Sequence, residues 1–363
     1  MNYTELIQKS PIFLPDATYG VVKSVDSHDL RTCGIEAVVM NTFHLMTKPG
    51  STIIKSLGGL HQMTNWDEMI ITDSGGFQAY SLIHSYPKTG SISDHGLVVH
   101  LSGNNKRILL TPEKSIQLQM NYGSDIIYCL DDCTHPDAPF DEQEQAVKRT
   151  IKWAIKCKKE YERIISEKKI DHINRPRIFA VIQGGRSFEL RKLCSDRLQE
   201  IGFDGYGYGG WPIDSKGKLL SELLNFVKKS IQQTLPLHAL GIGHPENLVK
   251  ANILGWHLFD SALPTRDARR GRLYAIRQFQ LTRNSLEKMD WFDFVYILDE
   301  KHIKSKTSIY PGCECYTCQQ YSTGYLHHLC KIDDPLYFRL ATIHNLSYMN
   351  TVCEILRNDD KTN

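Results

Sequence analysis

The side chains with the most distinctive chemistry lie near the C-terminus, where three cysteines fall within six residues. The segments PGCECYTCQQ and YFRLATIHNLSYM together supply four side chains that bind metals, namely Cys313, Cys315, Cys318 and His344. Three thiolates and one imidazole suit a tetrahedral zinc ion, and four protein ligands leave no open position for a substrate. The cluster therefore predicts a structural zinc site. His327 and His328 lie nearer in sequence, so spacing leaves the fourth ligand open, and ordinary buried thiols are the alternative.

Two aspartates follow apolar runs in segments that are rich in glycine or arginine. Asp73 stands in ITDSGGFQAYSL, and Asp260 stands in LFDSALPTRDARRG. Burial can raise the pKa of one such carboxyl group, while hydrogen bonds and cations keep another ionised. A nucleophile and a proton shuttle are what glycosyl transfer by double displacement requires. A turn at Asp73 and a helix cap at Asp260 are the structural alternatives.

Eight short apolar runs that end in polar residues or glycine predict strands buried on both faces. These runs are Ile12–Leu14, Ala37–Met40, Met69–Ile71, Ile126–Leu130, Ile178–Ile182, Gly205–Tyr208, Ala239–Ile242 and His257–Phe259. Helical segments lie between them. The clearest covers residues 141–169, where a stripe of roughly 3.6-residue period contains Val147, Ile151, Ala154, Tyr161 and Ile165.

The unusual polar residues distinguish a (β/α)8 TIM barrel from a doubly wound open sheet. They follow the predicted strand ends, at Asp73, Asp131, Gln183, Gly209–Gly210 and Asp260. A barrel builds its active site at this edge, so we predict an α/β (β/α)8 TIM barrel with a C-terminal zinc-binding subdomain. We expect one domain over residues 1–363, with the subdomain at 285–345 inserted near the last barrel helix. The long connection from Tyr80 to Leu110 predicts a lid or an extra hairpin.

Composition narrows the class of protein. The 363 residues contain 43 Lys+Arg and 41 Asp+Glu, for a net charge of +2, so a nucleic-acid site requires a local basic patch. We see no apolar stretch of the roughly 20 residues that span a bilayer and no basic-then-apolar leader at the start. Ten cysteines are too few for a disulfide scaffold. We therefore expect a cytoplasmic protein without a membrane segment.

The motifs together resemble those of tRNA-guanine transglycosylases. They run in order from about Phe13 to Met349 and comprise TDSGGFQ, LTPEKS, GSDI with DDC, IQGG, DGYGYGG, FDSALPTRDARRG and CECYTCQQYSTGYLHHL with IHNLSYM. The resemblance implies a zinc-containing TIM barrel that exchanges the wobble guanine of certain tRNA anticodons for a 7-deazaguanine of the queuosine pathway. The Cys-x-Cys-x2-Cys-x25-His spacing of this family implies His344 as the fourth zinc ligand.

The resemblance also implies roles for the two aspartates. Asp260 would attack the anomeric carbon of the ribose and form a covalent RNA–enzyme intermediate. Asp73 would act as general acid/base, first for the departing guanine and then for the incoming base. No external cofactor is implied besides the structural zinc, because one glycosidic bond is exchanged for another.

Five further residues would hold the base, by the same resemblance. Asp131 would accept hydrogen bonds from the ring N–H and the exocyclic amine, and Gln183 with the Gly210 N–H would serve the carbonyl edge. Phe77 would stack on one face of the purine, and Leu240 would approach the other. A flipped purine is generally held in this way, by edge hydrogen bonds and stacking.

Four arginines after the second aspartate predict contact with phosphates, which arginine binds well. Arg266 and Arg269 match RNA-contacting positions of the family, so the anticodon loop of tRNA is the expected partner. For Arg270 and Arg272 an ordinary solvated surface is an equal alternative. The family also implies a homodimer with contacts near the zinc site, where aromatic side chains would pack across the interface, here Tyr321, Tyr325 and His328.

The strip GGWPIDSKG departs from the family pattern. Bacterial members carry Gly-Gly-Leu-Ala-Val-Gly-Glu there and eukaryotic members Gly-Gly-Leu-Ser-Gly-Gly-Glu, beside the 7-substituent of the base. Here Trp211, Pro212 and Ile213 are bulky, and Asp214 or Ser215 stands near the place of the acid. The sequence therefore leaves open queuine, the 7-aminomethyl precursor and a less usual 7-deazaguanine.

Three alternative functions follow from the same residues. A paralogue could modify guanine in DNA by unchanged chemistry, and a zinc-stabilised barrel could act on a small molecule. A non-catalytic partner subunit could bind RNA, but such subunits lose the catalytic aspartates, whereas Asp73, Asp131 and Asp260 are all present here.

Overall fold

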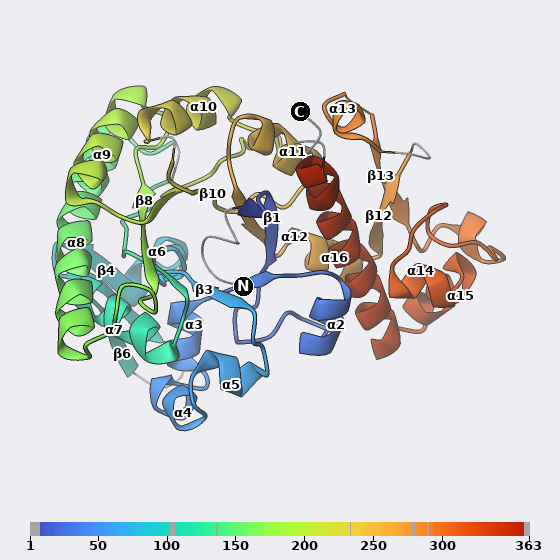
Figure 1. Ribbon diagram of the computed structural model, residues 1–363, viewed down its shortest axis with the longest axis horizontal. Helices are drawn as coiled ribbons and strands as arrows, with labels where there is room; N and C mark the ends of the chain where they lie inside the picture. Colours follow the sequence, from blue (N-terminus) through green and yellow to red (C-terminus); the bar gives the residue numbers. More distant parts are fainter. Residues whose placement is uncertain are drawn as a thin grey trace.

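Eight short parallel strands form a barrel in the computed structural model, which describes residues 8–101, 106–135, 137–232, 234–277, 281–288 and 290–358 (Figure 1). Around the barrel the strands run in the order β1 (Ile12–Pro15), β11 (Leu258–Ser261), β10 (Leu237–Ala239), β9 (Gly205–Tyr208), β8 (Arg177–Ile182), β7 (Ile126–Tyr128), β3 (Met69–Thr72) and β2 (Ala37–Met40). The ring closes just beyond β1, where Ala17 N–H donates to Val39 O at 2.7 Å. The predicted (β/α)8 barrel is therefore confirmed, and the open sheet is wrong.

The strands match the predicted runs closely except in one case. The run Ala239–Ile242 is misplaced, because β10 begins at Leu237 and ends at Ala239. Beyond the strand, Gly241 adopts a left-handed backbone with φ of +80° and turns the chain toward the next helix. Leu240 consequently belongs to the loop at the barrel mouth.

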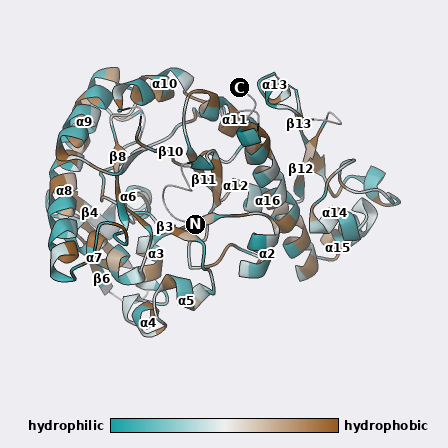
Figure 2. Cartoon of the chain, viewed as in Figure 1, coloured by the Kyte–Doolittle hydropathy of each residue, from teal (hydrophilic) through white to brown (hydrophobic). Residues whose placement is uncertain are grey.

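Helices cover the outside of the barrel with their apolar faces inward (Figure 2). The longest follows the predicted stripe, since Val147, Ala154 and Tyr161 are buried, while Ile151 and Ile165 pack partly buried against the core. Along the barrel the helices are α2 (Ser27–Thr32), α3 (Thr42–Thr47), α4 (Ser51–Ser56), α5 (Leu60–Thr64), α6 (Gly76–Ser85), α7 (Pro112–Tyr122), α8 (Phe140–Glu167), α9 (Phe188–Ile201), α10 (Ser221–Ser230), α11 (Pro245–Ile253) and α12 (Leu263–Arg269).

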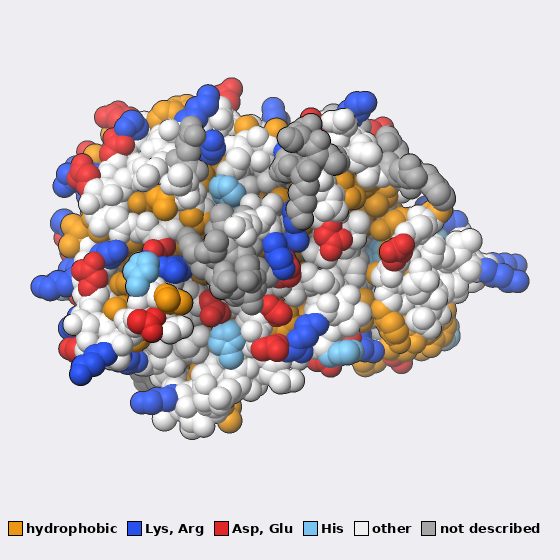
Figure 3. Space-filling view, in the orientation of Figure 1, with side chains coloured by type: hydrophobic (Ala, Val, Ile, Leu, Met, Phe, Trp, Pro, Cys, Tyr) orange, Lys and Arg blue, Asp and Glu red, His pale blue; other side chains and the backbone are white. Residues whose placement is uncertain are grey.

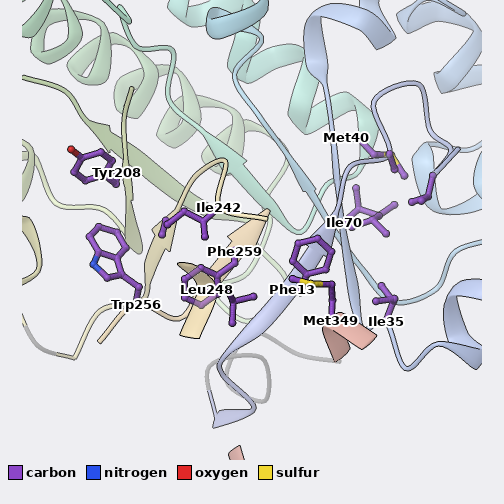
Figure 4. Packing of buried hydrophobic residues seen from close by; sticks show 14 of the residues in the cluster. Phe13, Ile35, Met40, Ile70, Tyr208, Ile242, Leu248, Trp256, Phe259 and Met349 are labelled. Carbon is purple, nitrogen blue, oxygen red and sulfur yellow. The ribbon is translucent and has the colours of Figure 1, made fainter. Parts of the chain in front are cut away.

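Two apolar clusters hold these layers together. One lies between strands and helices and includes Phe13, Ile70 and Phe259 (Figure 4). The other fills the inside of the barrel with side chains from strand after strand, namely Ile12, Leu14, Ala37, Val39, Met69, Ile71, Ile126, Tyr128, Phe179, Val181 and Leu258. The inner cluster lies directly beneath the candidate site, and several of its residues line the cavity. Within the part of the chain described, no helix combines the length and the apolar character needed to cross a bilayer.

The long connection after α6 forms a small sheet instead of a simple hairpin. A 3-10 turn (Pro87–Thr89) leads into the antiparallel strands β4 (Gly90–Ser93), β5 (Gly96–Leu101) and β6 (Lys106–Leu110). The turn between β4 and β5 is tied to α8, since Trp153 Nε1 donates to Asp94 O at 3.1 Å and Lys152 Nζ to Asp94 Oδ2 at 2.7 Å. The sheet is therefore anchored to the barrel wall.

The C-terminal part lies beside the barrel, at the right of Figure 1. It contains the antiparallel pair β12 (Arg272–Ile276) and β13 (Phe292–Tyr296), with α13 (Arg283–Leu286), a 3-10 turn (Glu300–His302), α14 (Tyr316–Gln320), α15 (Thr323–Lys331) and α16 (Pro335–Asn358). Helix α16 packs against α12 and β12 and also against α14 and α15. It is therefore the element that joins the cysteine cluster to the barrel.

Candidate active site and metal centre

A cavity of about 510 Å³ opens at the C-terminal ends of the barrel strands. Its walls contain all but one of the predicted catalytic, base-binding and RNA-binding residues, namely Asp73, Phe77, Asp131, Gln183, Gly210, Leu240, Asp260 and Arg266. Six strand ends or following loops thus converge on one space. This is the position of the active site in TIM-barrel enzymes.

Asp73 is held at the end of β3 by three donors. Its Oδ1 accepts from the N–H groups of Thr42 (3.1 Å) and Gly75 (2.9 Å), and its Oδ2 accepts from Asn41 Nδ2 (2.7 Å). Gly75 has φ of +79°, and a Cβ there would come within 2.9 Å of Phe43 N, so the turn requires glycine. Burial outweighs these hydrogen bonds and raises the pKa of Asp73 to about 7. The group can therefore carry or release a proton near neutral pH.

Asp260, at the end of β11, has one oxygen anchored and the other free. Its Oδ1 accepts from the Gly241 N–H at 3.0 Å, and His238 Nε2 lies 2.9 Å from the same oxygen. The His238 contact is close but outside the angular range of a hydrogen bond. Among the described residues, Oδ2 has no hydrogen-bond partner. A carboxylate held by one oxygen and open at the other is suited to nucleophilic attack.

Asp131 lies deeper, after β7, and is paired with the neighbouring strand. Gln183 Nε2 donates to its Oδ2 at 2.7 Å, and Ser74 Oγ donates to its Oδ1 at 3.3 Å. Burial raises the pKa of Asp131 to about 6. Burial also raises the pKa of the adjacent Asp132 to about 6, although Arg149 forms an ion pair with it. The Gln183 amide therefore donates one N–H to Asp131 and links the ends of β7 and β8.

The backbone around Gly209 and Gly210 is fixed from below by a buried arginine. Arg191 is 1% exposed and donates to the carbonyl oxygens of Gly185 (3.0 Å), Ile182 and Gly209 (2.9 Å). A Cβ on Gly209 would approach Gln183 Nε2 to 2.5 Å, so this position requires glycine. Arg191 thus locks the ends of β8 and β9 together.

The rim of the cavity is aromatic. Phe77 is 52% exposed, and its ring lies 5.6 Å from that of Trp211, which also lies 5.5 Å from His135. Trp211, Pro212 and Ile213 line the cavity, but Asp214 does not. The Asp214 carboxylate accepts from the N–H groups of Lys216 and Lys218, both at 2.9 Å, and so stabilises its own turn.

The four predicted arginines differ in their surroundings. Arg266 is exposed and lines the cavity. Arg269 does not line it; this side chain is partly buried, its Nη1 has no hydrogen-bond partner among the described residues, and Asp16 lies within electrostatic reach. Arg272 forms an ion pair with Asp267 and lies 5.8 Å over the Phe294 ring. Arg272 is thus engaged within the protein, whereas Arg266 faces outward.

The metal-ligand side chains meet at one buried point. His344 Nδ1 lies 3.7, 3.4 and 3.5 Å from the sulfurs of Cys313, Cys315 and Cys318, and all four ligand atoms fall within 4.8 Å of one another. These separations are near the edge of about 3.7 Å expected for a tetrahedron of zinc–ligand bonds. His344 Nε2 lies 2.7 Å from Tyr274 O and must donate to it, which directs the Nδ1 lone pair at the sulfurs. The residues fit a tetrahedral metal ion.

Several residues of the site escaped the sequence reasoning. Asn41 supports Asp73, and Asp16 lies within electrostatic reach of both catalytic candidates, with its own pKa raised by burial. Tyr128 and His238 lie behind Asp260. Asp16 and Asn41 follow predicted strands and could have been found by that rule. Tyr128 and His238 lie within or next to apolar strand residues, and nothing in the sequence marks them as functional.

Comparison with known proteins places the chain in a family. The sequence model described as "Queuine tRNA-ribosyltransferase" matches residues 4–359. A queuine tRNA-ribosyltransferase of Actinobacillus pleuropneumoniae is 35% identical over 97% of this chain and 85% of the relative. One of Pseudoalteromonas translucida is 36% identical over 96% and 86%, and one of Pseudoalteromonas atlantica is 37% identical over 98% and 89%. The chain therefore belongs to the queuine tRNA-ribosyltransferase family.

Proposed function

We propose that this protein is a tRNA-guanine transglycosylase, which exchanges the wobble guanine of a tRNA anticodon for a 7-deazaguanine in queuosine biosynthesis or salvage. The observation that carries the proposal is the pairing of two carboxylates in one cavity with different environments. Asp260 has a free oxygen at the mouth, and Asp73 has a pKa of about 7. This division into nucleophile and proton shuttle is what double displacement needs.

In the first half of the reaction, Asp260 Oδ2 would attack the anomeric carbon of the ribose. The glycosidic bond to guanine breaks, and Asp73 protonates the departing base. In the second half, Asp73 removes the proton from the incoming base, whose nitrogen attacks the same carbon. The bond to Asp260 breaks, and the carboxylate is restored. Two inversions at one carbon retain the configuration of the nucleoside.

The base would lie between the rim and the depth of the cavity. Asp131 would accept hydrogen bonds from its ring N–H and amine, while the Gln183 amide and the Gly210 N–H would serve its carbonyl. Phe77 and Leu240 would cover its two faces. All five residues line the cavity, which supports this assignment.

The wall beside the 7-substituent would be formed by Trp211, Pro212 and Ile213. Asp214, the acidic residue near the place of the acid in the family pattern, accepts hydrogen bonds within its own turn. This strip therefore offers the substituent aromatic and aliphatic surface in place of a carboxylate. This wall would therefore determine which 7-deazaguanine the protein accepts.

The anticodon loop of tRNA would approach over Arg266 and Arg269, in the cytoplasm. Positive and negative side chains are interspersed on the face shown in Figure 3, in agreement with the net charge of +2. Phosphate binding would therefore depend on these local arginines and not on a broad basic surface.

We propose zinc as the ion at Cys313, Cys315, Cys318 and His344, where it would stabilise the subdomain of residues 285–345 within a single domain of residues 1–363. A closed set of four protein ligands supports a structural role. We further propose a homodimer through the neighbouring aromatic surface. Tyr325 is 40% exposed and stacks on Tyr321 and His328, with ring centroids 5.5 and 6.4 Å apart.

The test is to incubate the protein with tRNA that carries an unmodified wobble guanine, offering queuine, the 7-aminomethyl base and labelled guanine in parallel. A DNA duplex serves as the control polymer. We expect exchange into tRNA only, and denaturation during turnover should trap RNA on the protein. The product mass identifies the base. Exchange into DNA alone would favour the DNA-modifying paralogue, and binding of tRNA without exchange would favour the non-catalytic subunit.

A further inference from the structure

A buried pair of polar side chains lies directly behind Asp260. His238, on β10, is fully buried with 0% exposure, and its Nε2 lies 2.9 Å from Asp260 Oδ1. Its other ring nitrogen, Nδ1, lies 2.7 Å from the hydroxyl of Tyr128 on β7. Tyr128 is 3% exposed, and Phe179 closes the space beside it with ring centroids 5.5 Å apart. The polar pair thus lies where the apolar barrel interior meets the wall of the cavity.

The two contacts determine which nitrogen carries the proton. Nε2 faces a carboxylate, which only accepts hydrogen bonds when ionised, so this nitrogen must be the N–H. Nδ1 is then the acceptor, and the Tyr128 hydroxyl donates to it. The opposite tautomer would place a nitrogen lone pair against Asp260 Oδ1. Tyr128 therefore fixes the tautomer that carries the N–H on Nε2, the nitrogen that lies 2.9 Å from Asp260 Oδ1.

We propose that His238, oriented by Tyr128, is a positioning residue that stabilises the ionised carboxylate of Asp260 in the exchange reaction. The inference rests on the proposed function. Together with the Gly241 N–H it holds Oδ1, so that Oδ2 points to the substrate. The Nε2–Oδ1 distance of 2.9 Å is short enough for a hydrogen bond, and a small rotation of either side chain would align it.

His238 and Tyr128 should stabilise the ionised form of Asp260 more than its ester form. Asp260 is an anion before attack and after release, but a neutral ester in the covalent intermediate. An N–H donor stabilises an anion more than an ester, so His238 favours the two states on either side of the intermediate. It makes Asp260 a better leaving group, and its removal should let the intermediate accumulate.

The experiment compares His238→Phe, His238→Gln and Tyr128→Phe in base exchange with tRNA. For His238→Phe we expect kcat to fall about ten- to a hundredfold, the range of a charge-assisted hydrogen bond, with the KM for tRNA changed less than about twofold. The fraction of protein trapped as adduct should rise at steady state. His238→Gln, which retains an N–H, should recover most of kcat, and Tyr128→Phe should give a smaller loss in the same direction.

Two matched controls separate this role from packing. His257→Phe changes a histidine at the opposite end of β11, where its Nδ1 accepts from Leu237 N–H at 3.1 Å. Tyr122→Phe removes a buried hydroxyl that has no hydrogen-bond partner among the described residues. Both controls should keep kcat within about twofold of wild type.

Parallel loss of kcat and adduct in His238→Phe, or a His238→Gln variant no better than His238→Phe, would overturn the inference and leave the side chain a packing role. If the wild-type protein exchanges bases and the His238 variants have the same kcat, the inference is also overturned, but the proposed function stands. Absence of any adduct or exchange with wild-type protein would instead overturn the proposed function, and the inference with it.

Discussion

The barrel mouth and the cysteine cluster each gather polar side chains, but they arrange them in opposite ways. At the cluster, three sulfurs and Nδ1 of His344 converge on one point, and the remaining nitrogen of His344 is committed to Tyr274 O. At the mouth, the polar groups line an open cavity, and Asp260 keeps one oxygen without a partner among the described residues.

The difference shows that burying polar side chains has a different effect in each region. In the cluster all four ligand atoms face one buried point, an arrangement that suits a structural metal ion with no open coordination position. At the mouth burial raises the pKa of Asp73 to about 7 and that of Asp131 to about 6, which costs stability at neutral pH. Substitutions should therefore separate the two regions: those at the mouth should abolish turnover while the metal stays bound, and those at the cluster should release the metal and destabilise the fold.

The largest effect is expected from Asp260→Asn. An amide is a poor nucleophile, so base exchange should fall by at least about a thousandfold and no adduct should form. Labelled-guanine incorporation into tRNA measures the rate, and metal content and circular dichroism should stay unchanged. Near-normal incorporation would show that the open carboxylate is not the nucleophile.

Cys315→Ser should show the opposite pattern. Loss of one thiolate should release the metal and lower the free energy of unfolding by about 3 kcal/mol or more, since binding of a structural ion contributes to folding. Denaturant unfolding and metal analysis measure both effects. Cys330→Ser, at a cysteine outside the cluster, should keep the metal. A stable, metal-free Cys315→Ser protein would contradict the structural role.

Asp73→Asn tests the cost of a buried carboxyl group. The folded pKa of about 7 exceeds the ordinary value of 3.8, so between these values folded Asp73 binds a proton that the unfolded chain has lost. Wild-type stability from this group therefore falls as the pH rises from about 4 to 7. The stability of the variant relative to wild type should increase by about 1–3 kcal/mol from pH 4 to pH 8.

Urea unfolding at both pH values measures this difference. Asp137→Asn, at a carboxylate whose side chain is 66% exposed, is the control and should show little change with pH. A flat difference for Asp73→Asn would indicate that the carboxyl group is not desolvated. Exchange activity of Asp73→Asn should be lost as well, because the proton shuttle is removed.

The smallest effect is expected at the rim. Arg266→Ala should weaken tRNA binding about three- to tenfold and reduce the salt dependence of log K by about 1, because one phosphate contact is lost. Filter binding at several salt concentrations measures both. Arg163→Ala, on the outer face of α8 where Arg163 pairs with Glu160 and Glu167, should change neither. An unchanged salt slope for Arg266→Ala would place the RNA elsewhere.

Much of this architecture could be predicted because parallel barrel strands are short, apolar and followed by polar residues. Seven of the eight predicted runs overlap their strands closely, and only β10 is displaced, since Leu240 and Ile242 are as apolar as the strand itself. The cysteine cluster was visible because soft ligands rarely crowd by chance. Its fourth ligand came from the family pattern, because His344 is distant along the chain.

What could not be predicted depends on contacts between strands. Tyr128 and His238 are 110 positions apart and meet only when β7 and β10 face each other across the barrel interior. Arg191 appears in sequence as a surface residue of an amphipathic helix, yet its guanidinium lies buried against three carbonyl oxygens. The three-stranded sheet over residues 90–110 was expected as a lid or hairpin, since alternation in short strands is weak.

Helix α16 makes the two regions mechanically dependent on each other. It carries His344 and, next to it, Asn345, whose Nδ2 donates to Pro264 O at 3.0 Å and to Arg272 O at 3.1 Å, while its Oδ1 accepts from Tyr274 N–H. Pro264 follows Asp260 by four residues. If the proposed zinc is bound there, a chelator that removes it should also disturb the segment that carries Asp260, so that base exchange falls together with metal content.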